Sequence, residues 1–342
     1  MVLMKMAKNT GYTKKVNSSF KPLEKAIFQI FKTNLAVKNN EKLLIVFDKN
    51  KKSLVNLFLK IGVLFTKNID SIEIPVGNVN GEEPPSETAK QMLNYNIEIM
   101  ITTKSLTHTK ARKNACKKGA RIATLPNILE ATLKRAININ YKEMLNLLKR
   151  LADILDKGNK VKISSKKGTN LTFSISSRKT RGRGSGLFTK KGDYGNLPGG
   201  EAFIAPLEGS AEGICMIDGS VGSIGKVDKP ITITFKKGYA LNITGGSSAK
   251  KLNSLLNKAG RLSRNLAEFG IGTNKGAKII GNMLEDEKVI GTCHIALGNN
   301  MGFGGKVKVP LHIDGLIKQP TIFVDGKKIM DKGKFTFKTK NI

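Results

Sequence analysis

Tryptophan is absent from the 342 residues of this sequence, and aromatic residues together make up only 6% of it. The core must therefore be built mainly from Ile, Leu, Val and Met. Cysteine is scarce as well, and the three residues Cys116, Cys215 and Cys293 form no CxxC pair. An odd, unpaired set argues against a disulfide framework and a thiolate zinc site, and it favours a reducing compartment.

Long hydrophobic runs are missing too. The longest apolar stretch, residues 54–65, is interrupted by Lys60 and is too short to cross a membrane. The opening residues, MVLMKMAKNT, hold no apolar signal core and no small-residue cleavage site. We therefore expect a cytoplasmic protein with no membrane partner.

Acidic residues are few. Asp and Glu number 26 against 59 Lys and Arg, which gives a net charge of +33. A hyperthermophile surface enriches Glu alongside Lys, so it does not explain this imbalance. A charge of this size attracts polyanions, and we expect RNA or the ribosome as a partner. The candidate contacts lie in a basic N-terminal arm, on one helix face and in a Gly-rich basic loop: Lys14, Lys15, Lys110, Lys113, Lys117, Arg178, Arg181 and Arg183.

Hydrophobic periodicity divides the chain into two domains after a basic arm at residues 1–20. In residues 21–158, short apolar runs alternate with segments of helical spacing, which predicts a Rossmann-like α/β domain with a parallel sheet. No GxGxxG follows any predicted strand and no Walker A lysine loop is present, so no motif supports a nucleotide-binding role. In residues 159–342, short strands alternate with Gly-rich turns around one helix at 249–266, which predicts an α+β, strand-rich domain.

Histidine is the sharpest chemical clue, because only three are present. His294 lies in CHIALG and His312 begins the triplet HID. On a strand, an HxD pair turns His312 and Asp314 to the same face, because alternate residues share a side. Imidazole and carboxylate on one face are ligands for zinc, cobalt, manganese or iron. The same alternation turns Cys293 away from His294, so we expect this thiol to pack in the core.

Two acids stand in apolar, Gly-rich surroundings. Glu201 starts an apolar strand after the turn NLPGG, and Glu268 is expected at the end of a helix in LAEFGIGTN. A carboxylate in such surroundings is costly to bury unless it is paired or binds metal. We therefore place Glu201 and Glu268 in the candidate site, where an acid not fully committed to metal can transfer a proton as a catalytic residue.

Taken together, these motifs resemble one family. The stretches SLTHTKARKNACKKGARIATLP, GNLPGGEAFIAPLEG, LAEFGIGTN, EDEKVIGTCHIALG and LHIDG are similar to those of thermophilic metallo-aminopeptidases of the T and S type. The resemblance implies an archaeal source, a C-terminal domain with one or two divalent metal ions, a peptide N-terminus as substrate and a homodimer. It places the metal ligands at Glu201, Glu268, His294, His312 and Asp314.

Met301 departs from this resemblance, because active relatives carry Tyr or His at that position. A thioether donates no proton and binds hard divalent ions poorly. The first interpretation is therefore a metal-dependent aminopeptidase, associated with RNA or ribosomes, whose turnover Met301 weakens. The alternative is a weak or silent RNA- or ribosome-binding protein that keeps the metal site. A third is an iron-dependent ring-cleaving dioxygenase, because distant relatives do such chemistry and a His, His, Asp set suits iron.

Overall fold

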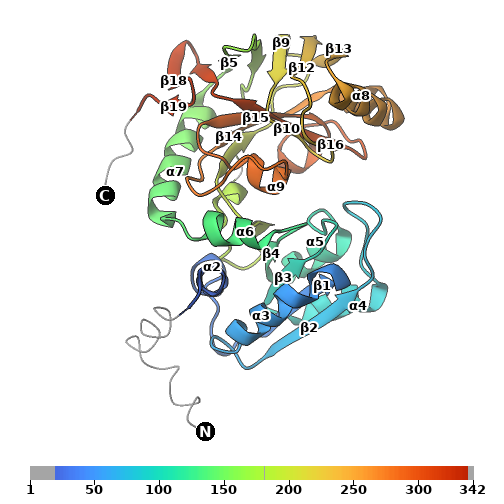
Figure 1. Ribbon diagram of the computed structural model, residues 1–342, viewed down its shortest axis with the longest axis vertical. Coiled ribbons are helices and arrows are strands. Elements are labelled where there is room, and N and C mark those ends of the chain that lie inside the picture. The colour runs from blue at the N-terminus through green and yellow to red at the C-terminus, as the bar shows by residue number, and fades with distance from the viewer. Residues whose placement is uncertain (1–19, 181, 338–342) are drawn as a thin grey trace. The chain divides into compact units, whose positions relative to one another are not determined.

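The structure, a computed structural model, describes residues 20–180 and 182–337. Within them the chain forms two compact units (Figure 1). Unit 1 consists of the chain up to Ile139 together with Gly186–Gly199. Unit 2 consists of Asn140–Ser185 and the chain from Gly200 onward. The division therefore falls at Ile139 instead of near residue 158, because helix α7 (Tyr141–Lys157) belongs to unit 2.

Unit 1 contains a five-stranded parallel sheet in the order β2-β1-β3-β4-β7. Its strands are β1 (Leu43–Asp48), β2 (Ile69–Ile74), β3 (Ile97–Ile101), β4 (Arg121–Thr124) and β7 (Tyr194–Asn196). The strands β1, β3 and β4 are buried along their whole length, as parallel strands covered on both faces must be. The sequence does not predict β7, since three residues with a central glycine carry no hydrophobic alternation.

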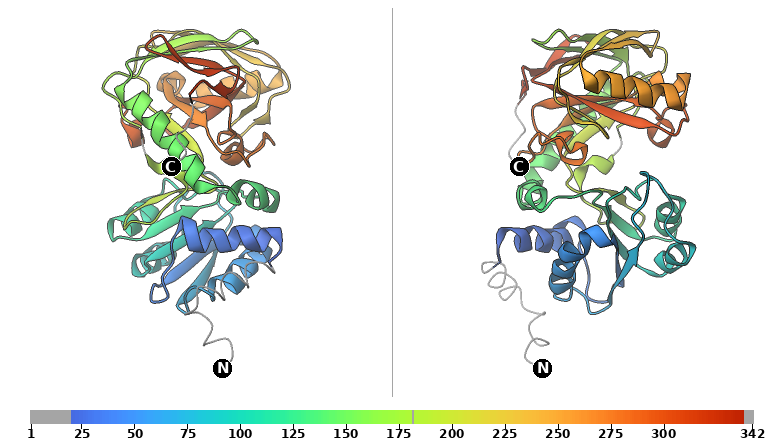
Figure 2. Two further views of the ribbon diagram at one scale, coloured as in Figure 1. Left: turned by 90° about the vertical axis from the view of Figure 1, so that its left-hand side faces the viewer. Right: turned by 45° about the vertical axis from the view of Figure 1, so that its right-hand side comes forward.

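Short helices precede and follow these strands. They are α2 (Pro22–Gln29), η2 (Ile30–Asn34), η3 (Lys49–Lys51), α3 (Lys52–Gly62), α4 (Ser86–Gln91), η4 (Met92–Asn94), α5 (Lys110–Lys117), α6 (Glu130–Thr132) and η5 (Leu133–Ile137). Helix α5 begins where the Thr109 hydroxyl accepts a hydrogen bond from the backbone N–H of Arg112 at 3.2 Å. On one face of the sheet, Ala111 of α5 joins the same apolar cluster as Leu44 and Ile122. Helices α2 and α3 lie on the other face, as Figure 2 shows.

Unit 2 is built from two antiparallel sheets. The six-stranded sheet has the order β11-β10-β16-β15-β14-β8. Its strands are β8 (Glu201–Ile204), β10 (Ser220–Val221), β11 (Gly225–Lys226), β14 (Leu266–Gly272), β15 (Thr292–Gly298) and β16 (His312–Lys318). The eight-stranded sheet has the order β13-β12-β9-β6-β5-β17-β18-β19. Its strands are β5 (Lys160–Ser164), β6 (Asn170–Ser174), β9 (Glu212–Ile217), β12 (Ile231–Lys236), β13 (Tyr239–Thr244), β17 (Thr321–Val324), β18 (Lys327–Asp331) and β19 (Lys334–Phe335).

The two sheets of unit 2 pack face to face. The six-stranded sheet therefore has one face against the larger sheet and a second face that the larger sheet does not cover. Phe173 of β6 meets Phe269 of β14 with ring centroids 5.3 Å apart. A Cβ added to Gly315 of β16 would lie 2.2 Å from Cδ1 of Ile217 of β9, so only glycine allows this approach. The inner face of the six-stranded sheet is thus apolar and closely packed.

The helical elements of unit 2, besides α7, are η6 (Gly182–Ser185), α8 (Ser247–Ala259), η7 (Arg261–Arg264), α9 (Met283–Asp286) and η8 (Met301–Phe303). The predicted helix at 249–266 ends early, because Gly260 adopts a positive φ of 85° directly after α8. Glu268 therefore stands inside strand β14, and its expected place at a helix end is wrong.

The predicted fold class is confirmed: a parallel-sheet α/β part is combined with a strand-rich α+β part. In the part of the chain that the structure describes, no helix is both long enough and apolar enough to cross a membrane.

Candidate metal centre

Strand register brings the candidate ligands to one face of the six-stranded sheet. Glu268 lies opposite Ala296, which in turn lies opposite Asp314. His294, two residues from Ala296 on β15, and His312, two residues from Asp314 on β16, share that side by alternation. Glu201 joins it from β8, where it pairs with Gly272. All five residues that the sequence singled out therefore project from the same face.

Glycine clears the space for this cluster. Gly270 is the cross-strand partner of His294, and a Cβ at Gly270 would lie 2.1 Å from the His294 Nε2 atom. The imidazole therefore lies directly over the backbone of β14. Ala296 and Gly298 stand at the neighbouring positions of the same face and add little bulk. The GIG in LAEFGIGTN has the composition of a turn, but it lies in strand β14, where Gly270 leaves room for the His294 ring.

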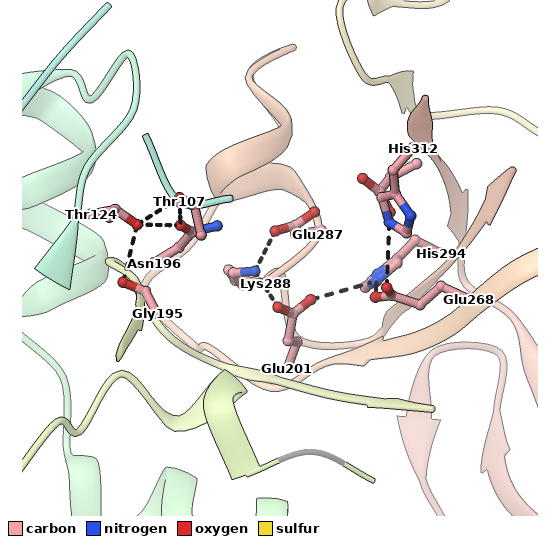
Figure 3. Close-up of polar contacts among 11 residues, drawn as sticks. Thr107, Thr124, Gly195, Asn196, Glu201, Glu268, Glu287, Lys288, His294 and His312 are labelled. Atoms are coloured by element: carbon pink, nitrogen blue, oxygen red, sulfur yellow. Dashed lines mark hydrogen bonds and ion pairs between the residues drawn. The ribbon is translucent and has the colours of Figure 1, made fainter. Parts of the chain in front are cut away.

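Glu268 is the centre of the cluster and contacts both imidazoles (Figure 3). Its Oε1 is 3.3 Å from His294 Nε2, and its Oε2 is 3.4 Å from His312 Nε2. His312 Nε2 is also 3.4 Å from Asp314 Oδ1, and His294 Nε2 is 3.5 Å from Glu201 Oε2. Each Nε2 atom thus faces two carboxylates.

The ligand atoms form two groups that Glu268 links. Glu268, His312 and Asp314 each offer one atom within 4.8 Å of the others, and so do Glu201, Glu287 and His294. The second ring nitrogen of His312 is also hydrogen-bonded, because Nδ1 lies 2.8 Å from the backbone oxygen of Asn299. A hydrogen bond on the far nitrogen fixes the ring and presents Nε2 to a metal ion.

Two members of the site, Glu287 and Lys288, are missing from the sequence-based set. Lys288 is 1% exposed, and its Nζ lies 2.6 Å from Glu201 Oε1 and in contact with Glu287 Oε1. Both follow α9 in the run EDEK, which has the composition of a solvated charged turn. Its position just before the histidine strand is the signal that could have pointed to them.

The other two acids of that run have a structural task. Asp286 accepts hydrogen bonds from the backbone N–H groups of Ile280 and Gly281 and from the Ser220 hydroxyl, at 2.8, 2.9 and 2.6 Å. Glu285 accepts one from the backbone of Lys278 at 2.9 Å. Both carboxylates hydrogen-bond the backbone of the loop that precedes α9. These bonds fix α9 and thereby the positions of Glu287 and Lys288, which follow it.

Charges within the site shift one another's pKa values. Burial alone would raise the pKa of Glu268, but hydrogen bonds from His294 and His312 hold it well below its usual range. Burial would lower the pKa of His294, but the Glu268 hydrogen bond and the Glu201 charge raise it to about 9. Protonated imidazoles therefore balance the carboxylates, and a divalent cation can replace those protons. The donor set fits such an ion, because imidazole and carboxylate are its usual ligands.

Met301 is 51% exposed in η8. Its neighbour Asn300 is buried and already occupied, since its Nδ2 donates to Glu208 Oε1 at 2.9 Å and its Oδ1 accepts from the Val307 backbone at 2.9 Å. Asn300 is thus committed to the fold of its loop and leaves no free side-chain amide to take the place of the donor that Met301 lacks.

The expected RNA-binding residues differ in their exposure. Lys110, Lys113 and Lys117 are all exposed on α5, as a binding face requires. Arg178 is 9% exposed and paired with Glu208, so its assignment to an open basic loop is wrong: the guanidinium is buried in an ion pair. Lys14, Lys15 and Arg181, and the side chain of Arg183, lie outside the described residues. RNA or ribosome binding stays a prediction.

The family model of NicX, 2,5-dihydroxypyridine 5,6-dioxygenase, matches residues 36–337, which is most of the sequence. The chain belongs to this family. The structure of 2,5-dihydroxypyridine dioxygenase from Pseudomonas putida is similar to this NicX-family chain, with a TM-score of 0.79 and 18% identity over 92% of this chain and 96% of that one. Wild-type AmpT from Thermus thermophilus is similar too, with a TM-score of 0.70 and 16% identity over 92% and 99%. No curated protein matches.

These comparisons correct the functional interpretation. The fold is like that of AmpT, as the resemblance to aminopeptidase T implies, but an identity of 16% supports likeness in fold alone. The NicX family match points to a ring-cleaving oxidoreductase. The aminopeptidase interpretation is therefore wrong, and the dioxygenase, the third interpretation, is better supported. The comparisons do not address the expected archaeal source.

Proposed function

We propose that this chain is an iron-dependent dioxygenase that opens a hydroxylated aromatic ring of the hydroxypyridine class. The match to the NicX family supports the reaction class. The observation that carries the proposal is the convergence of two imidazole Nε2 atoms with the carboxylates of Glu268 and Asp314 on one sheet face. Imidazole and carboxylate sets with open positions are typical of non-haem iron oxygenases.

The ion would be held by Glu268, His312 and Asp314, whose ligand atoms lie within 4.8 Å of one another. His294 adjoins this set, because its Nε2 is 3.3 Å from the nearer oxygen of Glu268. When bound, ferrous iron supplies the redox chemistry by which molecular oxygen reacts with the ring. A reaction of this class would break one ring bond and place both atoms of molecular oxygen in the product.

Aromatic side chains beside His312 suit a flat substrate. Phe303 lies edge to face with the His312 ring, with centroids 5.8 Å apart, and Phe203 lies edge to face with Phe303, also at 5.8 Å. Phe203 stands two residues from Glu201 on the ligand-bearing face of β8. Such rings contact an aromatic substrate over a wide area and orient it. Phe303 and Phe203 would thus hold the ring next to the ligands.

A hydroxylated ring gives up a proton as it binds. Glu201 is placed to accept it, because Lys288 engages its Oε1 while its Oε2 lies 3.5 Å from His294 Nε2. Glu268 is assigned to the ion together with His312 and Asp314, whereas Glu201 lies outside that set. The proton is therefore assigned to Glu201 Oε2, a general-base role for which carboxylates are suited.

The test is to load the purified protein with ferrous iron without oxygen and then supply oxygen with 2,5-dihydroxypyridine or other dihydroxylated rings. We expect iron-dependent oxygen uptake and a product that carries both atoms of isotopically labelled O2. His312→Ala should lose bound iron and oxygen uptake together, since it removes a ligand at the centre of the set.

Lys318→Ala is the matched control, because Lys318 is exposed at the other end of the same strand β16. It should keep both iron and turnover. An iron-loaded wild type that takes up no oxygen with any hydroxylated ring would contradict the proposed function, and so would His312→Ala with undiminished iron.

A further inference from the structure

The second group of ligand atoms already contains a cation. Glu201, Glu287 and His294 could together hold a metal ion, as Glu268, His312 and Asp314 could. Lys288 Nζ, however, lies between the two glutamates, 2.6 Å from Glu201 Oε1 and in contact with Glu287 Oε1 (Figure 3). One oxygen of each of these two glutamates therefore already binds an ammonium group in the place where a second ion would lie.

The backbone keeps Lys288 in this position. Its N–H donates to Glu285 O at 3.0 Å, and its own carbonyl accepts from the Asn274 backbone at 2.8 Å. A Cβ on Gly272 of β14 would lie 2.9 Å from the Lys288 carbonyl carbon, so the two chain segments are in close contact. The Lys288 backbone is thus fixed against both α9 and β14, and its ammonium is held by the two glutamates.

Charge also favours a single metal ion. The face gathers four carboxylates, those of Glu201, Glu268, Glu287 and Asp314. One ammonium and one divalent ion leave a single negative charge, which the imidazoles can solvate. A second divalent ion would either make the net charge positive, if the ammonium stayed, or displace a buried ammonium from its two partners, at high cost.

We propose that Lys288 is a built-in cation that replaces a second divalent metal, so that each chain holds one ion, at Glu268, His312 and Asp314. This inference rests on the proposed function for the existence of that one ion. A single ion would distinguish this site from two-metal hydrolytic centres, in which two ions about 3.5–4 Å apart both take part in catalysis. The prediction of up to two metal ions is thereby narrowed to one.

The experiment measures bound metal, not turnover. Wild type, Lys288→Met, Lys288→Arg and the exposed control Lys278→Met are incubated with excess manganese chloride, freed of loose metal and assayed for manganese per chain. We expect one ion per chain in wild type, Lys288→Arg and Lys278→Met, and two in Lys288→Met, which keeps the side-chain length but loses the charge. Paramagnetic resonance should show coupled manganese pairs in Lys288→Met alone.

Lys288→Met leaves two partly buried carboxylates without a counter-ion, so folding is checked by circular dichroism with and without manganese. Should it unfold without metal, the second ion should restore it, whereas Lys288→Met combined with Glu287→Gln should fold with one ion. Two ions in the wild type, or a folded Lys288→Met that binds one, would overturn the inference while leaving the dioxygenase proposal intact. No ion in the wild type would contradict both, and one ion without oxygen uptake would contradict only the proposed function.

Discussion

Replacing Glu98 with methionine should stabilise unit 1, and increasingly so as the pH rises. Glu98 lies in the middle of the parallel sheet, opposite Leu44 on one side and Ile122 on the other, and it is fully buried. Neither of its carboxyl oxygens has a hydrogen-bond partner in the described chain, and burial raises the pKa of the group well above its ordinary value. The folded chain therefore keeps a proton on Glu98 that the unfolded chain loses.

Proton linkage gives the sign and the size of the change in stability with pH. Because the folded state binds more protons than the unfolded state, stability falls as the pH rises from the unfolded pKa of Glu towards the raised folded value. The loss is about 1.4 kcal/mol per pH unit within that window. The substitution Glu98→Met would abolish this slope and would also remove an unsatisfied polar group, which is worth about 1–3 kcal/mol. Glu98→Gln should flatten the slope without that second gain.

Urea unfolding is followed at pH values from about 5 to about 8, with pulse proteolysis reporting fragments that contain β1 and β3, because the two units need not unfold together. The stabilisation by Glu98→Met should grow steadily with pH. Parallel curves for wild type and both variants, or a loss of stability in the methionine variant at neutral pH, would show that the carboxyl is ionised or paired in the folded chain.

Two further predictions concern the site and the sheet. Gly270→Ala should lower bound metal severalfold at unchanged helix and strand content, because the new Cβ would collide with His294 Nε2; elemental analysis measures this, and Gly302→Ala, which meets nothing within 4 Å, should change nothing. Arg121→Met should cost about 3–5 kcal/mol in urea unfolding, because it leaves Glu41 without its two 2.8 Å hydrogen bonds from a buried guanidinium. A cost under about 1 kcal/mol would mean that the pair behaves as a surface ion pair.

The alternation of side chains along a strand made much of the site predictable. It placed His312 and Asp314 on one face and turned Cys293 to the other, where the structure has it buried in β15. Glu268 was expected at a helix end, whereas it stands in strand β14, where Gly270 opens space for His294. Lys288 could not be found, because a lysine among acids is ordinarily solvated, and only the folding of α9 buries it.

The class of reaction could not be predicted from the ligand residues alone. Two histidines and several carboxylates suit zinc in a hydrolase and iron in an oxygenase equally well. The identity of the bound ion depends on its availability and on small differences in geometry, which residue types do not encode. The family match over residues 36–337 points to a reaction class that the ligand set leaves open.

The path of the chain between its two units has a consequence for biosynthesis. The chain passes from one unit to the other after Ile139, after Ser185 and again after Gly199. Strand β7, which completes the parallel sheet, is therefore made only after β5 and β6 of unit 2. A nascent chain that ends before β7 leaves the outer edge of β4 unpaired, and such edges invite aggregation. Ribosome-bound chains should thus need protection at β4 until β7 emerges, and residues 20–139 expressed alone should associate through that edge.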